Sequence, residues 1–190
     1  MLWDTHMHSQ FSGDSHTPQE DMIAAARTKK FKGICLQTIL TLTIRTNRRH
    51  FCWICRIMSL PWRQCRRNIR NSPVRLGIEL GLQPHLAGIH ADILSQYPFD
   101  FVIGSSHVMH GVDPYYPAYY EGRSEHAAYL EYFESILENL HAFSEMDVYG
   151  HIDYIVRYGP NQNKYYTYER YQDILDEILR TVIARDGEVS

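Results

Sequence analysis

Histidines and one glutamate in this chain follow apolar runs, where side chains from separate strands can converge on a metal ion. His6 and His8 end the first such run, and three later runs lead to Glu79, His107 and His151. In an extended segment, side chains two residues apart point to the same side, so His6 and His8 can bind one ion. A buried carboxylate without a partner is costly, and a metal ion would supply a partner for Glu79. The pattern predicts a metal centre rather than a set of surface histidines.

Three further side chains near these positions have two interpretations each. Asp14 is either a metal ligand or a turn acid ahead of a helix. Arg157 either clamps a phosphate with its guanidinium or forms a surface salt bridge. His110 faces either the same cleft or solvent. The remaining histidines are expected to be structural or at the surface: His16, His50, His85, His90, His126 and His141.

Short apolar runs alternate with amphipathic helices along the chain, which is typical of an α/β fold with parallel strands. Strands are expected at 2–8, 33–36, 74–81, 99–106 and 148–152, and helices at 84–97, 124–143 and 168–184, with a further helix that starts at Thr17. The first helix should begin with Thr17 as its N-cap and Pro18 as its first helical residue. In barrels of parallel strands the active site lies at the carboxyl ends of the strands. The predicted ligands fall at such ends.

The segment 37–72 differs sharply in composition from the rest of the chain. It contains eight arginines and three of the four cysteines, with no lysine and no acidic residue, and it has no helical or strand period. It has three interpretations: a basic arm for nucleic acid, a reading-frame shift, or a zinc site built from His50, Cys52, Cys55 and Cys65. We favour the frame shift, because the composition changes abruptly at both borders. The coding DNA would decide between them.

Five ordered motifs resemble the polymerase-and-histidinol-phosphatase (PHP) family, and in detail its histidinol-phosphate phosphatase branch. The resemblance covers residues 1–36 and 73–190. The motifs are Asp-Thr-His-Met-His-Ser at 4–9, Phe-Ser-Gly-Asp at 11–14, Gly-Ile-Glu at 77–79, Gly-Ser-Ser-His at 104–107 and Gly-His-Ile-Asp at 150–153.

The resemblance implies one domain over 1–190 with the family's distorted (β/α)7 barrel and up to three divalent ions. These would be zinc, iron or manganese. By position, His6 and His8 would hold one ion, and Glu79 would bridge it to a second. That second ion would be completed by His107 and His151. Asp14 would correspond to a ligand of a third ion, and Arg157 would bind substrate.

Two departures from the family pattern weaken the expected metal site. The family's second strand runs into Thr-Asp-His, whereas Gln37-Thr38-Ile39 stands here. The family also ends with an Asp-x-His that supplies two more ligands, but this chain stops at residue 190, so the C-terminal strands are expected to be missing. Both departures leave the same two ions with open coordination.

The resemblance implies a phosphomonoester hydrolase in which a metal-bound water attacks phosphorus and no protein nucleophile is needed. The expected reaction is hydrolysis of L-histidinol phosphate to L-histidinol and phosphate, a step of histidine biosynthesis. Two alternatives stay open: another phosphoesterase or exonuclease of the family, and an inactive fragment of a broken gene. The chain is acidic outside 37–72, which disfavours a nucleic-acid partner, and its apolar runs are too short for a membrane span. No secretory signal precedes Asp4, so we expect a cytoplasmic enzyme with a small phosphorylated substrate.

Overall fold

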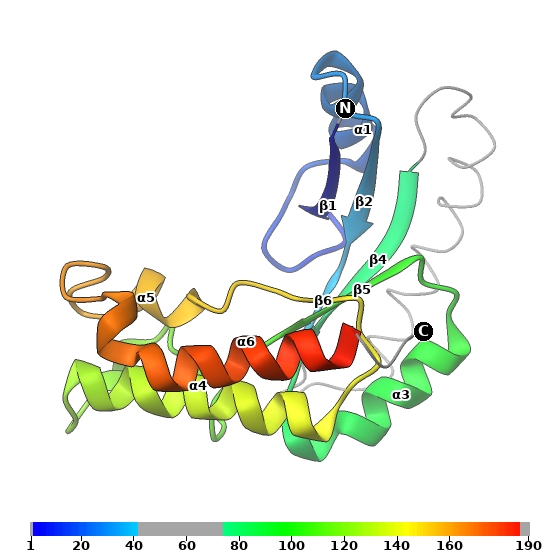
Figure 1. Ribbon diagram of the computed structural model, residues 1–190. Helices are drawn as coiled ribbons and strands as arrows, with labels where there is room; N and C mark the ends of the chain where they lie inside the picture. The colour runs from blue at the N-terminus through cyan, green and yellow to red at the C-terminus, as the bar shows by residue number, and fades with distance from the viewer. Residues whose placement is uncertain (1, 42–73, 187–190) are drawn as a thin grey trace. The chain divides into compact units, whose positions relative to one another are not determined.

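The computed structural model describes residues 2–41 and 74–186 (Figure 1). The described chain divides into two compact units. Unit 1 comprises Met1–Leu80 and Ala91–Ile103, and unit 2 comprises Gly81–His90 and Gly104–Ser190. Residues 42–72 lie outside the described residues, and with them His50, the three cysteines of that segment and all three interpretations of it. The expectation of one domain over 1–190 stays a prediction.

Parallel strands form the centre of unit 1. The strand β1 (Trp3–His8) pairs in parallel with β2 (Gly33–Gln37), and β2 pairs in parallel with β4 (Val74–Gly81). The short β3 (Ile39–Thr41) also pairs with β4. These pairings confirm the predicted class, an α/β fold with parallel strands.

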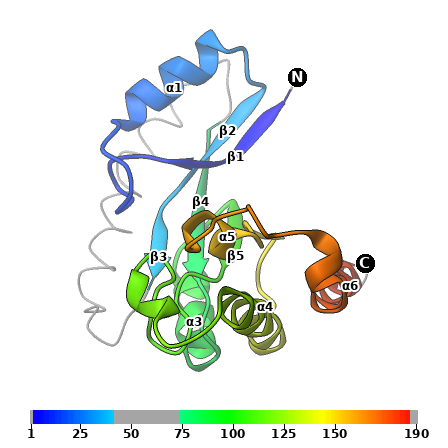
Figure 2. The ribbon, with the colours of Figure 1, turned by 90° about the vertical axis from the view of Figure 1, so that its left-hand side faces the viewer.

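One helix covers part of this sheet in unit 1 (Figure 2). The helix α1 (Gln19–Thr28) is amphipathic, and its Ile23 and Ala26 join the buried core formed with Ile34 and Leu36 of β2. The expected start at Thr17 is wrong by one residue, because Pro18 is the N-cap and no side chain caps the helix. The Pro18 carbonyl instead accepts the first helical N–H groups. Two acidic residues in the first turn also suit the positive end of the helix dipole.

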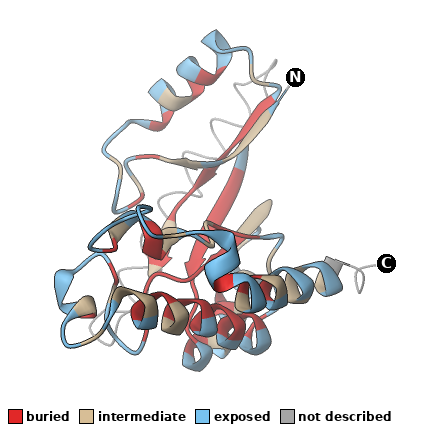
Figure 3. Ribbon diagram, turned by 60° about the vertical axis from the view of Figure 1, so that its left-hand side comes forward, coloured by how far each residue is buried: buried red, intermediate tan, exposed pale blue. Residues whose placement is uncertain are grey.

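Unit 2 is organised around one long helix, α4 (Glu125–Ala142), as the sequence predicts. Its N-cap is Ser124, whose hydroxyl accepts a hydrogen bond from the Ala127 N–H at 3.2 Å. The helices of this unit bury one face and expose the other (Figure 3). The elements that pack against α4 are η1 (Pro84–Leu86), η2 (Pro117–Tyr120), α5 (Tyr154–Tyr158) and α6 (Gln172–Asp186), with η3 (Tyr168–Tyr171) leading into α6.

The remaining elements are the helix α3 (Ala87–Gln96) and the strands β5 (Phe101–Ser105) and β6 (Val148–Tyr149). The helix α3 and the strand β5 contribute residues to both units. The strand β6 is shorter than the predicted 148–152. Its extension, the Gly150 N–H, donates to the Gly104 carbonyl at 2.8 Å, after which the chain turns away. In the described part of the chain, no helix is both long and apolar enough to cross a membrane.

Candidate metal centre

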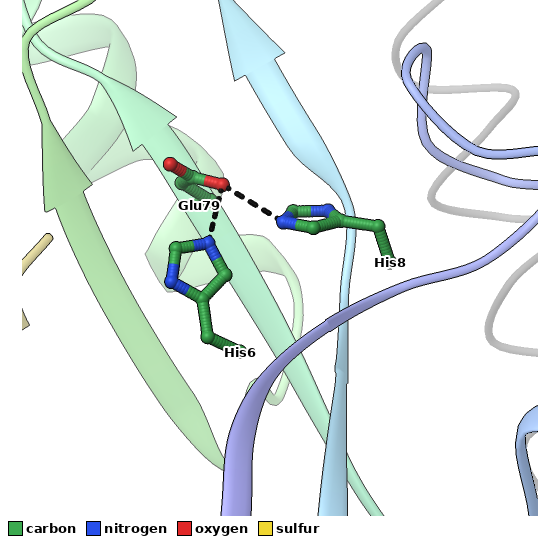
Figure 4. Close-up of side chains that lie close together, drawn as sticks. All are labelled: His6, His8 and Glu79. Carbon is green, nitrogen blue, oxygen red and sulfur yellow. Dashed lines mark hydrogen bonds and ion pairs between the residues drawn. The ribbon is translucent and has the colours of Figure 1, made fainter. Parts of the chain in front are cut away.

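Unit 1 brings three of the predicted ligands together (Figure 4). The Nε2 atom of His6 lies 2.9 Å from Oε2 of Glu79, and the Nε2 atom of His8 lies 3.2 Å from the same oxygen. The two imidazoles come from β1 and the carboxylate from β4, 73 residues away in sequence. The expectation that His6 and His8 point to one side is therefore confirmed.

The carboxylate of Glu79 is held in an apolar strand. Its neighbours Ile78 and Leu80 are fully buried, and Glu79 itself is only 1% exposed, against 34% for the side chain of His6. The Glu79 N–H donates to the Thr38 carbonyl at 2.9 Å, which fixes the backbone at this point. The buried carboxylate therefore lies beneath two more accessible imidazoles.

The donor set fits a divalent transition-metal ion. The ligand atoms of His6, His8 and Glu79 all lie within 4.8 Å of one another. Two imidazole nitrogens and a carboxylate oxygen are a combination that binds zinc, and iron or manganese also accept these donors. In the described arrangement a hydrogen bond to Glu79 raises the pKa of His6, because the imidazolium form gains a negative partner. Protonation of His6 and metal binding at His6 are alternatives, since both use the same ring nitrogen.

The second ring nitrogen of His8 has its own partner. Its Nδ1 atom lies 3.0 Å from the Ser12 hydroxyl, which also accepts from the Ile39 N–H at 3.2 Å. Such partners orient a ligating histidine and fix which nitrogen faces the metal. The sequence analysis missed Ser12, and its only signal was its place in the quoted motif at 11–14.

Asp14 lies beside His8 but outside the three-residue group. Its Oδ1 atom is 3.7 Å from Nδ1 of His8, the nitrogen that faces away from Glu79, and its side chain is 52% exposed. In this arrangement Asp14 neighbours a ligand rather than sharing an ion with Glu79. Its role as a ligand of a third ion stays a prediction.

Unit 2 brings the other two predicted histidines together. His107 follows β5 and His151 follows β6, and their Nε2 atoms lie 3.4 Å apart with the rings stacked. Two nitrogens that bind one tetrahedral ion at zinc's usual bond length lie about 3.3 Å apart. The spacing of this pair therefore suits a shared ion. The bridging of two ions by Glu79 stays a prediction.

A tyrosine that the sequence analysis missed covers this pair. The ring of Tyr154 lies 5.1 Å from that of His107 and 5.5 Å from that of His151, between ring centres. Its hydroxyl donates to the Asp113 carboxylate at 3.1 Å. Its sequence signal was the spacing of three residues from His151, which places two side chains on the same side of a helical turn.

The remaining predicted positions divide into surface and core. Arg157 is exposed on α5, and its role in substrate binding stays a prediction. His110 lies at the surface, where its Nδ1 atom contacts the Glu131 carboxylate at 2.9 Å. Of the histidines expected to be structural or at the surface, His90 is fully buried, His126 is half-buried, and His16, His85 and His141 are exposed.

Neutral side chains occupy the end of β2, where the family pattern has Thr-Asp-His. Gln37 is fully buried, and its Nε2 atom donates to the Thr5 carbonyl at 2.8 Å. The Thr38 hydroxyl donates to the Phe11 carbonyl at 2.7 Å. A Cβ atom on Gly77 would lie 2.3 Å from Oε1 of Gln37, so Gly77 leaves room for the Gln37 amide in this position. Gln37 and Thr38 therefore tie β2 to its neighbours and add no metal ligand of the usual kind.

Comparison with known proteins decides the family. A family model described as the PHP domain matches residues 4–189. The chain belongs to the PHP family. The resemblance read from its five motifs is thereby confirmed.

Two proteins similar to this chain are named as histidinol-phosphatases. A probable histidinol-phosphatase of Clostridium acetobutylicum is 30% identical over 98% of this chain and 71% of its own length. A histidinol-phosphatase of Lactococcus lactis is 26% identical over 96% of this chain and 68% of its own length.

Solved structures show the same PHP fold. The Lactococcus lactis histidinol phosphate phosphatase, complexed with zinc, L-histidinol and phosphate, superposes with a TM-score of 0.83 at 24% identity, over 97% of this chain and 70% of that one. A putative histidinol phosphatase of Listeria monocytogenes has a TM-score of 0.74 at 16% identity, over 97% of this chain and 79% of that one.

Proposed function

We propose that this PHP chain is a metal-dependent phosphomonoester hydrolase that converts L-histidinol phosphate and water to L-histidinol and phosphate. The observation that carries the proposal is the convergence of His6 and His8 on the buried carboxylate of Glu79, in a chain of this family. The names of the two curated relatives support the choice of substrate. The activity would belong to histidine biosynthesis, in the cytoplasm.

The residues have distinct roles in this proposal. His6, His8 and Glu79 would hold one ion, and His107 with His151 would hold another. Bound divalent ions supply a hydroxide from water near neutral pH and neutralise charge on the phosphoryl oxygens. Glu79 offsets part of the positive charge of the site from a position that solvent does not reach. Arg157 would pair with the phosphate of the substrate through its guanidinium.

Zinc is the first ion to test. Imidazole and carboxylate donors suit it, and the related Lactococcus structure was determined with zinc. Iron and manganese remain alternatives for the same donors.

A phosphate-release assay tests the proposed function. The purified chain is stripped with a chelator, reloaded with zinc, manganese or iron, and given L-histidinol phosphate, p-nitrophenyl phosphate or a short single-stranded oligonucleotide. We expect metal-dependent phosphate release with the highest kcat/KM on L-histidinol phosphate. A preference for the oligonucleotide would make the chain a nuclease of the family. No release with any of the three ions would identify an inactive chain.

A further inference from the structure

A buried polar network surrounds the residue that precedes His107. The Ser106 hydroxyl accepts a hydrogen bond from Nδ2 of Asn139 at 2.6 Å and lies 2.5 Å from the Tyr149 hydroxyl. Ser106 is fully buried and Asn139 almost so. Polar groups are placed inside a core at a cost unless they hydrogen-bond, and here they bond to one another. The network fixes the Ser106 backbone, and His107 follows it directly.

The helix α4 reaches both histidine-bearing loops through a single hydroxyl. Tyr132 is fully buried, and its hydroxyl oxygen lies 3.4 Å from the Ser106 carbonyl and 3.4 Å from the His151 carbonyl. The hydroxyl donates its hydrogen between these two acceptors. Burial raises the pKa of Tyr132 well above its ordinary value, so the hydroxyl keeps its proton at any pH at which the enzyme would work.

The backbone at His151 is in a conformation that needs support. Its φ is +27°, in the left-handed region that side chains other than glycine rarely adopt. A residue in such a region persists only when its surroundings hold it there. The His151 carbonyl receives two hydrogen bonds, from the Tyr154 N–H at 3.0 Å and from the Tyr132 hydroxyl. Tyr132 therefore helps to hold the turn that presents the His151 ring.

We propose that Tyr132 is a positioning residue for the His107–His151 pair, acting by tying the backbones at Ser106 and His151 to one hydroxyl on α4. The inference rests on the proposed function, in which this pair holds a metal ion. The two histidines come from different strand ends, and an ion requires their nitrogens at one set spacing. The ring of Tyr132 also stacks on Tyr154, at 6.4 Å between ring centres, and Tyr154 contacts both imidazoles.

The same helix offers a matched control. Tyr129 lies three residues before Tyr132, is also fully buried, and donates its hydroxyl hydrogen to the Gln162 carbonyl at 3.0 Å. Tyr129→Phe and Tyr132→Phe each remove one hydroxyl from the same helix, which contacts one backbone carbonyl in the case of Tyr129 and two in the case of Tyr132. A merely structural role for Tyr132 would make the two variants alike.

The test measures metal binding directly. Zinc is titrated into the stripped full chain and into both variants in competition with a chromophoric chelator, and cobalt is added separately to record its visible absorption. We expect Tyr132→Phe to weaken the binding of one zinc equivalent by roughly 10- to 100-fold, as loss of an outer partner does at metal sites. Its cobalt spectrum should also change. Tyr129→Phe should keep the wild-type zinc affinity and spectrum.

Ser106→Ala provides a second variant, because it removes the hydroxyl that Asn139 and Tyr149 hold. It leaves the Tyr132 hydroxyl in place and should weaken the same zinc equivalent, so it tests whether the pair depends on a fixed Ser106 backbone, as the positioning role requires. Equal zinc affinities and cobalt spectra in wild type, Tyr132→Phe and Ser106→Ala would overturn the positioning role and leave the proposed function in place. A wild-type chain that binds none of zinc, iron and manganese would overturn both.

Discussion

Glu79 carries a charge among aliphatic side chains, and two imidazoles are its partners. Its oxygen is the common contact of His6 and His8, while Ile78 and Leu80 on either side are fully buried. An isolated charge in such surroundings would be strongly destabilising. Glu79 therefore needs partners for its carboxylate in order to stay charged at this buried position. This makes it the most informative single residue to change.

Glu79→Gln should abolish most metal binding at the His6–His8 site. The amide has nearly the same shape but no charge, so it is a far weaker ligand. We expect zinc affinity and phosphate release to fall by more than the roughly 10- to 100-fold that loss of an outer partner costs. Metal content after dialysis and kcat/KM on L-histidinol phosphate measure this.

The control for that variant is Glu131→Gln. Glu131 is a carboxylate on α4 that contacts His110 and Arg123. Its loss should leave zinc content and kcat/KM unchanged. Wild-type zinc content in Glu79→Gln would contradict the assignment of Glu79 as a ligand.

His90 is a buried histidine outside the candidate site. Both of its ring nitrogens lack a hydrogen-bond partner among the described residues, and its ring packs edge-on against Phe143. Burial, with a smaller effect of the positive charge on His85, lowers the pKa of His90 to about 4. The folded chain therefore keeps this ring neutral at pH values where the unfolded chain protonates it.

The sign of the pH effect follows from proton binding. Between about pH 6.5 and pH 4 the unfolded state binds the proton at His90 and the folded state does not, so stability falls as the pH falls through this window. One pKa unit corresponds to about 1.4 kcal/mol, which makes the full loss on the order of 3–4 kcal/mol.

His90→Leu should remove this loss. We expect the variant's urea midpoint to change less between pH 7 and pH 4.5 than that of the wild type, and to be no lower at pH 7, because an unpaired buried polar group is replaced by an apolar one. His141→Gln, at an exposed site near the end of α4, serves as the control. An unchanged pH dependence in His90→Leu would show that other groups govern acid unfolding.

At the scale of elements, α4 combines clear local sequence signals with contacts to the loops that carry His107 and His151. The buried face of α4 includes Tyr129, Tyr132 and Phe133, which recur at helical spacing. The helix packs against η1, near the start of unit 2 in sequence, and against α6, near its end. The helix begins where Ser124 satisfies one of its free N–H groups. Its stability should therefore depend on this cap.

Ser124→Ala should destabilise the chain by about 1 kcal/mol, the usual cost of losing an N-cap side chain. Urea unfolding followed by circular dichroism measures it. Ser144→Ala is the control, since Ser144 is exposed just after the same helix and contributes its carbonyl rather than its hydroxyl to a hydrogen bond. Equal midpoints for the two variants would mean that water replaces the Ser124 cap without cost.

At the scale of the whole molecule, the candidate ligands come from strands and turns far apart in the chain. The contacts between His6 and Glu79 and between His107 and His151 span 73 and 44 residues. Such pairs exist only in the folded chain, so an ion that binds them favours folding.

Zinc should therefore raise the melting temperature and a chelator should lower it. At a free zinc concentration about 100 times the Kd, binding adds about 2.7 kcal/mol. For a chain of this size, each kcal/mol corresponds to roughly 2–4 °C. Differential scanning fluorimetry should show the shift with zinc but not with calcium, which prefers oxygen ligands. A melting temperature that changes with neither zinc nor the chelator would argue against a metal centre.

Much of the local structure was determined by the sequence itself. The strands at 3–8, 33–37 and 74–81 and the helix 125–142 fall where periodicity and caps predict them, because these signals act over a few residues. The candidate ligands could also be identified by residue type, since histidine and glutamate at the ends of apolar strands indicate a chemical role.

Only the tertiary structure decided which side chains meet. It set Asp14 beside His8 rather than with Glu79, and it placed Ser12 and Tyr154 against ligands that their own sequence positions do not specify. It also brought the Tyr132 hydroxyl of α4 to the His151 carbonyl, at the left-handed turn that follows β6. The physical reason is that side-chain partners across strands and helices are selected by packing over tens of residues, which no local pattern encodes.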